Sequence, residues 1–141
     1  MTLKQFAVAY GATAVIFLAL DAMWLTVMAD RLYRPALGHI MVERFAMAPA
    51  VAFYAIYIIG VVVFAVAPAL PQRNWAGALG MGALLGLIAY ATYDLTNQAT
   101  LKGWPWQVTV ADLCWGTAVT AVSAAAACWI TSRWAGSAAA G

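Results

Sequence analysis

Four long apolar runs divide this sequence, and each is long enough to cross a lipid bilayer as a helix. They cover residues 5–29, 46–70, 75–98 and 106–133. A hydrocarbon core of about 30 Å takes about 20 helical residues to cross, so four spans fill most of the chain. Lipid cannot pair exposed backbone groups, which requires each span to be a helix. We therefore predict an all-α, polytopic membrane protein.

Composition supports a membrane setting and argues against several classes of soluble protein. Apolar residues make up 66% of the chain and charged residues 9%, whereas soluble domains carry about 25% charged residues. The net charge of +2 comes from dispersed residues and forms no basic stripe, so we expect no nucleic-acid partner. We expect one membrane domain over residues 1–141, folded as an antiparallel four-helix bundle with a long first connection, two short later ones and both ends on one side.

The third span contains a pair of small residues at helical spacing. Gly82 and Gly86 are four residues apart and lie on the same helix face. Such small-xxx-small pairs allow a second helix to approach closely. Either another span of this chain or a partner protein could occupy that face.

Three aspartates lie inside the predicted spans, where charged side chains are rare. Placing Asp21, Asp94 or Asp112 at a helix centre costs about 2.5–3.5 kcal/mol, so we expect all three to face the bundle interior. Because the spans alternate in direction, helical rise places each acid about 9–12 Å from the same membrane face. Like charges in a low dielectric cannot all ionise, so we expect at least one of these carboxyls to be protonated.

Aromatic and amide side chains accompany these acids at helical spacing. Tyr90, Asp94 and Asn97 follow an i, i+4, i+7 pattern on one face of the third span. Each of the other two acids begins an Asp-x-x-Trp pattern that ends at Trp24 or Trp115. This predicts a polar and aromatic layer that could be a ligand site, a proton relay or a hydrogen-bonded staple between helices.

Other polar residues give weaker indications. Tyr54 and Tyr57 are one turn apart near the start of the second span, at the membrane face that the acids approach. His39 and Glu43 lie in the connection over residues 30–45 and could share one face of a short interfacial helix. Two ligands are too few for a metal site, so we expect neither a metal nor another cofactor. No nucleophile elbow, phosphate loop or His-Glu-x-x-His motif supports soluble-type hydrolase or nucleotide chemistry, and enzymatic activity is left open.

Several short motifs resemble a family of bacterial four-span membrane proteins known only as a domain of unknown function. The motifs are DAMWL at 21–25, YDLTN at 93–97, ATL-x-GWP at 99–105 and DLCWG at 112–116, with Tyr33 and Leu37-Gly38 in the first connection. The resemblance implies a multi-pass protein of the bacterial inner membrane with a link to fatty-acid modification. It implies no catalytic residues. The candidate site comprises Asp21, Trp24, Tyr90, Tyr93, Asp94, Asn97, Asp112 and Trp115.

Three functions are compatible with this candidate site. The leading hypothesis is that it binds a lipid-like or amphipathic small molecule, as part of membrane lipid modification, with membrane lipids as partners. The second is a small proton-coupled transporter, acting as a homo-oligomer because four spans enclose little space. The third is a structural subunit that docks into a larger membrane complex through the glycine-rich face of the third span.

Overall fold

A computed structural model describes residues 1–134 of the chain, and these residues form helices joined by short connections. Residues 135–141 of the expected domain lie outside the described part. In chain order the elements are α1 (Leu3–Met28), η1 (Ala29–Tyr33), α2 (Arg34–Leu37), α3 (Met47–Val61), η2 (Val62–Val66), α4 (Ala67–Ala69), η3 (Leu70–Gln72), α5 (Trp75–Thr100) and α6 (Trp106–Trp134). They combine into four helices that are long and apolar enough to cross a membrane. The all-α, four-helix membrane architecture predicted above is confirmed.

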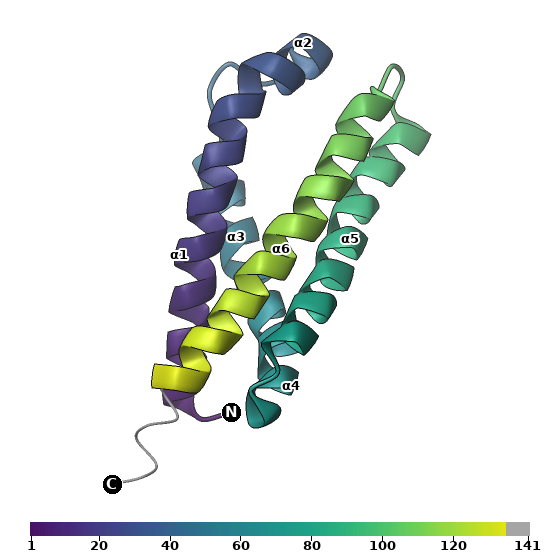
Figure 1. Cartoon of the computed structure of the whole chain (residues 1–141). Coiled ribbons are helices and arrows are strands. Elements are labelled where there is room, and N and C mark those ends of the chain that lie inside the picture. Colours follow the sequence, from purple (N-terminus) through teal and green to yellow (C-terminus); the bar gives the residue numbers. More distant parts are fainter. Residues whose placement is uncertain (135–141) are drawn as a thin grey trace, which may run out of the picture.

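The four helices run in alternating directions, and the start of α1 lies at the same end of the bundle as the end of α6 (Figure 1). The connection between the second and third helices is especially tight. Arg73 adopts a left-handed conformation with φ 50°, and the next residue, Asn74, caps α5 by accepting a hydrogen bond from the Gly77 N–H at 2.8 Å. A turn this short makes the two helices antiparallel neighbours.

The first helix is longer than the sequence pattern indicated. We expected a connection from residue 30 onward, but the chain continues as the π-helical turn η1 and then as α2, ending at Leu37. An ion pair of 2.6 Å between Asp30 and Arg34 supports this extension, and Pro35 lies in the first turn of α2, where proline is tolerated. The predicted helical pairing of His39 and Glu43 is wrong, because both are exposed in turns and bends after the helix has ended.

Helices α5 and α6 pack so closely that a Cβ atom at either of two glycines on α5 would collide with α6. A Cβ atom added at Gly86 would lie 2.2 Å from the carbonyl oxygen of Gly116, and one added at Gly82 would lie 2.8 Å from the carbonyl oxygen of Thr120. The partner of the small-residue pair is therefore α6 of the same chain. This occupies the face that the subunit hypothesis had assigned to a larger complex.

Buried apolar residues fill the bundle on the α4 side of the acids. The Phe17 ring packs edge-on against Tyr57, with ring centroids 5.4 Å apart, and the Tyr57 hydroxyl is 2.9 Å from that of Thr120 on α6. Toward the end that carries α2, α1 and α6 diverge (Figure 1). Phe17 also contacts Tyr54 on that side, so the core continues directly into the region where the acids lie.

Candidate functional site: an aromatic cavity with two aspartates

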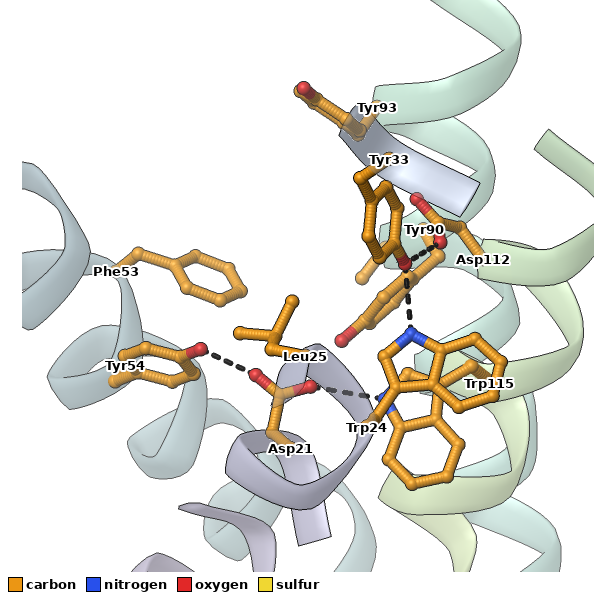
Figure 2. Close-up of a pocket in the computed structure, with 11 residues that line it drawn as sticks. Asp21, Trp24, Leu25, Tyr33, Phe53, Tyr54, Tyr90, Tyr93, Asp112 and Trp115 are labelled. Carbon is orange, nitrogen blue, oxygen red and sulfur yellow. Dashed lines mark hydrogen bonds between the residues drawn. The ribbon is translucent and has the colours of Figure 1, made fainter. Parts of the chain in front are cut away.

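A cavity of about 380 Å³ lies where the helices diverge, and side chains from α1, η1, α3, α5 and α6 form its wall (Figure 2). Its lining residues are Asp21, Trp24, Leu25, Tyr33, Phe53, Tyr54, Ala89, Tyr90, Tyr93, Asp112 and Trp115. Seven of these eleven are aromatic, two are acids, and none is basic. Six of the eight candidate residues from the sequence therefore meet at one cavity, and only Asp94 and Asn97 do not line it.

Asp21 forms one polar end of the cavity. Asp21 is 7% exposed, and its carboxyl accepts hydrogen bonds at both oxygens. The Tyr54 hydroxyl donates to one oxygen, and the indole N–H of Trp115 donates to the other at 3.0 Å. This carboxyl thereby joins α1 to both α3 and α6.

Asp112 forms the second polar end, and it depends on the extension of the first helix. The Tyr33 hydroxyl donates a hydrogen bond to Asp112 and accepts one from the indole N–H of Trp24 at 2.8 Å. Tyr33 is the last residue of η1, and π-helical turns insert an extra residue that redirects the side chains after it. The π turn thus ends at the side chain that connects the first helix to α6 at this end.

The two indoles stack and connect the two polar ends. Their ring centroids are 4.5 Å apart and their planes differ by 7°. The tryptophan of each Asp-x-x-Trp pattern interacts with the aspartate of the other pattern. Trp115 donates to Asp21, and Trp24 donates to the Tyr33 hydroxyl, which in turn donates to Asp112. The result is a continuous chain of contacts from α3 through α1 and α6 (Figure 2).

Asp94 lies behind the wall of the cavity. It is fully buried, and neither of its carboxyl oxygens receives a hydrogen bond from a described residue. Its carboxyl lies next to that of Asp112 on α6. The structure therefore brings the three acids into one region, with Asp94 next to Asp112 and Asp21 across the aromatic residues.

The predicted face of the third span divides between two environments. Tyr90 lines the cavity, whereas Asn97 lies beyond it, one helical turn from Tyr93. Tyr93 is 59% exposed and packs edge-on against Trp104, with ring centroids 5.8 Å apart. Asn97 therefore has a supporting position next to Tyr93 and does not line the cavity.

The candidate set from the sequence omitted five lining residues: Leu25, Tyr33, Phe53, Tyr54 and Ala89. The position of Tyr54 near the start of the second span predicts that it lies at the same end of the bundle as the acids. This position could have added Tyr54 to the candidate set. Tyr33 could not be found by spacing, because the helix was expected to end before it. Leu25, Phe53 and Ala89 are apolar residues in apolar spans, so their composition does not distinguish them from lipid-facing neighbours.

Replacing Tyr33 with phenylalanine should loosen the extension of the first helix. The change removes the donor to Asp112 and the acceptor for the Trp24 N–H, and each lost bond is worth about 0.5–1.5 kcal/mol. We expect faster hydrogen–deuterium exchange over residues 29–37. Tyr10→Phe is the matched control, because Tyr10 stacks on Phe6 and lies outside the cavity. Equal exchange in both variants would contradict a role for Tyr33 in holding this segment.

Comparison with known proteins places the chain in a family. No curated protein and no solved structure gives a match to it. A family model described as "Predicted membrane protein (DUF2177)" matches residues 6–129. That match covers the second and third membrane helices, most of the first and fourth, and every residue that lines the cavity. The chain therefore belongs to this family of membrane proteins.

Proposed function

We propose that this protein binds a lipid-like or amphipathic small molecule in the aromatic cavity. The observation that carries the proposal is the cavity itself, which combines seven aromatic residues with two convergent acids inside a membrane bundle. Ligand sites typically occupy about 300–1,000 Å³ and combine apolar walls with a few placed polar groups. A cavity of about 380 Å³ is within this range.

The mouth of the cavity suits a molecule that remains partly in the bilayer. Leu25, Phe53 and Tyr93 all line the cavity and are 41%, 47% and 59% exposed. These side chains offer an apolar rim, so an acyl or alkyl chain can leave the cavity without losing apolar surroundings. The polar end of the molecule would then lie between Asp21 and Asp112.

A second cavity adjoins the first and lies along the connection between the first and second membrane helices. It has a volume of about 890 Å³, and residues from Arg34 to Phe45 form most of its wall. Tyr93 lines both cavities. Ile40, Val42 and Phe45 are 56%, 70% and 72% exposed, which gives this connection an apolar surface suited to the headgroup region. We propose that a ligand reaches the aromatic cavity from this leaflet.

The proposed setting is the inner membrane of a bacterium, in membrane lipid modification. The motif resemblance supports this setting, and the polar groups of the cavity support binding rather than a particular reaction. We propose that the bound molecule is a membrane component. The protein would then accept or present this molecule while the molecule stays in the bilayer.

Native mass spectrometry of gently purified protein, followed by lipid extraction, tests this proposal. Ala89→Phe should fill the cavity without touching its hydrogen bonds, since Ala89 lines it and contributes no polar side chain. Ala99→Phe is the matched control, because Ala99 is exposed on the same helix and lines no part of the cavity. We expect a discrete molecule to remain with the wild type and the control and to be absent from Ala89→Phe.

Two results would count against the proposal. One is a wild type that carries no molecule beyond random membrane lipid, and the other is an equal load in Ala89→Phe. Circular dichroism of each variant establishes that its helices are intact.

A further inference from the structure

The aromatic cavity is acidic and contains no positive charge of its own. Asp21 and Asp112 line it, Asp94 is buried next to Asp112, and no lysine, arginine or histidine is among the lining residues. Arg34 follows the lining residue Tyr33 in the chain, but it lines the second cavity and is paired with Asp30. We infer that the ligand supplies the missing charge and is an amphipathic cation, with an amine or quaternary ammonium group at its polar end.

The inference rests on the proposed function and on the cost of unpaired buried charge. Buried ionised groups are normally paired, because transfer from water into an apolar environment costs far more than transfer of a neutral group. Both oxygens of Asp21 accept hydrogen bonds from the protein, and Asp112 accepts one from Tyr33, but no cation lies against either acid within the cavity wall. A ligand cation between the two acids would provide the counter-charge that the protein omits.

Aromatic rings provide the second requirement for binding a cation. Tyrosine and tryptophan faces attract ammonium groups within about 6 Å of the ring, and desolvated pairs are worth about 2 kcal/mol. Tyr33, Tyr90 and Trp24 all contribute rings to the cavity. Figure 2 shows the Tyr90 hydroxyl directed into the open middle of the cavity, between the two polar ends.

Tyr90 is also the lining tyrosine that leaves its hydroxyl available to a ligand. Tyr33 and Tyr54 donate to the two acids, and Tyr93 lies at the exposed rim, whereas Tyr90 is half-buried and has no hydrogen bond with another described residue. Residues 1–134 hold no group of three or more histidine, cysteine or acidic side chains that could bind a metal ion.

A matched series of twelve-carbon probes tests the charge preference. Radiolabelled dodecyltrimethylammonium, dodecanol and dodecanoate have the same chain and differ at the head. Binding to the full chain in dodecyl maltoside micelles can be followed by scintillation proximity. We expect saturable binding of the cation at least tenfold tighter than that of the alcohol, with dodecanoate weakest.

The variants locate the preference at the two acids. Asp21→Asn and Asp112→Asn should each reduce the cation's advantage over dodecanol by about tenfold, because each removes one negative charge while preserving the side chain's shape. Asp30→Asn is the control, since Asp30 is exposed, paired with Arg34 and outside the cavity. It should retain the wild-type preference. An unchanged preference in both cavity variants overturns the inference.

Failure of the inference can be distinguished from failure of the proposed function. If dodecanol or dodecanoate binds as tightly as the cation and Ala89→Phe abolishes that binding, the cavity is a ligand site but its ligand is not cationic. If none of the probes binds saturably and no molecule co-purifies with the wild type, both proposals are overturned.

Discussion

Replacing Gly86 with alanine is expected to destabilise the protein by about 1–3 kcal/mol, the usual cost of inserting a methyl group into a well-packed interior. The added Cβ would lie 2.2 Å from the carbonyl oxygen of Gly116, and Thr120 lies 2.8 Å away on the same side. Both neighbours belong to α6, and a backbone oxygen cannot move aside as a flexible side chain can. The α5–α6 pair would have to separate.

Gly80→Ala provides the matched control for this prediction. It makes the same chemical change on the same helix, but a Cβ atom at Gly80 has no neighbour within 4 Å. Alanine also favours helix over glycine, by about 1 kcal/mol in soluble proteins, so the control should be neutral or stabilised. Unfolding by sodium dodecyl sulfate titration compares the variants, and equal midpoints for Gly86→Ala and Gly80→Ala would refute the close-packing account.

Asp94→Asn is expected to stabilise the protein, by about 1 kcal/mol. Asp94 is fully buried without a hydrogen-bond donor at either oxygen, and its carboxyl lies next to that of Asp112. An amide of the same shape can donate to Asp112 and removes an acid–acid contact. Unsatisfied buried polar groups cost about 1–3 kcal/mol, which sets the scale of the gain.

The same substitution at Asp21 should have the opposite sign. Asp21 accepts from both Tyr54 and Trp115, and an amide can accept at only one end while its NH2 group faces the other donor. We expect a loss of about 1–2 kcal/mol in the same unfolding titration. If Asp94→Asn is also destabilising, Asp94 acts as a structural staple. A gain would mean that the fold tolerates an unfavourable acid, as functional sites commonly do.

The sequence predicted the four helices and six of the eleven residues that line the cavity, because both depend on short-range rules. Apolar runs of membrane length specify helices almost without alternatives. The cost of an aspartate in lipid turns Asp21 and Asp112 inward, and alternating helix direction puts them at one depth. The depth of each acid follows from helical rise and chain order alone. Neither of these two quantities depends on how the helices are rotated about their axes.

Other features depend on rotation and on local backbone geometry, which spacing does not determine. The π turn that ends at Tyr33 adds a residue to one turn, so a constant helical period misplaces the side chains from there on. The exchange of indoles between Trp24 and Trp115 depends on side chains meeting across α1 and α6. Asn97 was included because it shares a helix face with Tyr90. It lies too far along α5 to line the cavity.

The hydrogen-bond partners in the cavity lie far apart in the sequence, so they are synthesised one after another. Asp21 enters the membrane with the first helix, 33 residues before Tyr54 and 94 residues before Trp115. At ribosomal speeds of about 5–20 residues per second, its indole partner is made roughly 5–19 s after it. Tyr33 similarly waits 79 residues for Asp112. The nascent chain therefore contains an incompletely paired acid in its first helix until the last helix is inserted, and no fragment lacking α6 can assemble the cavity.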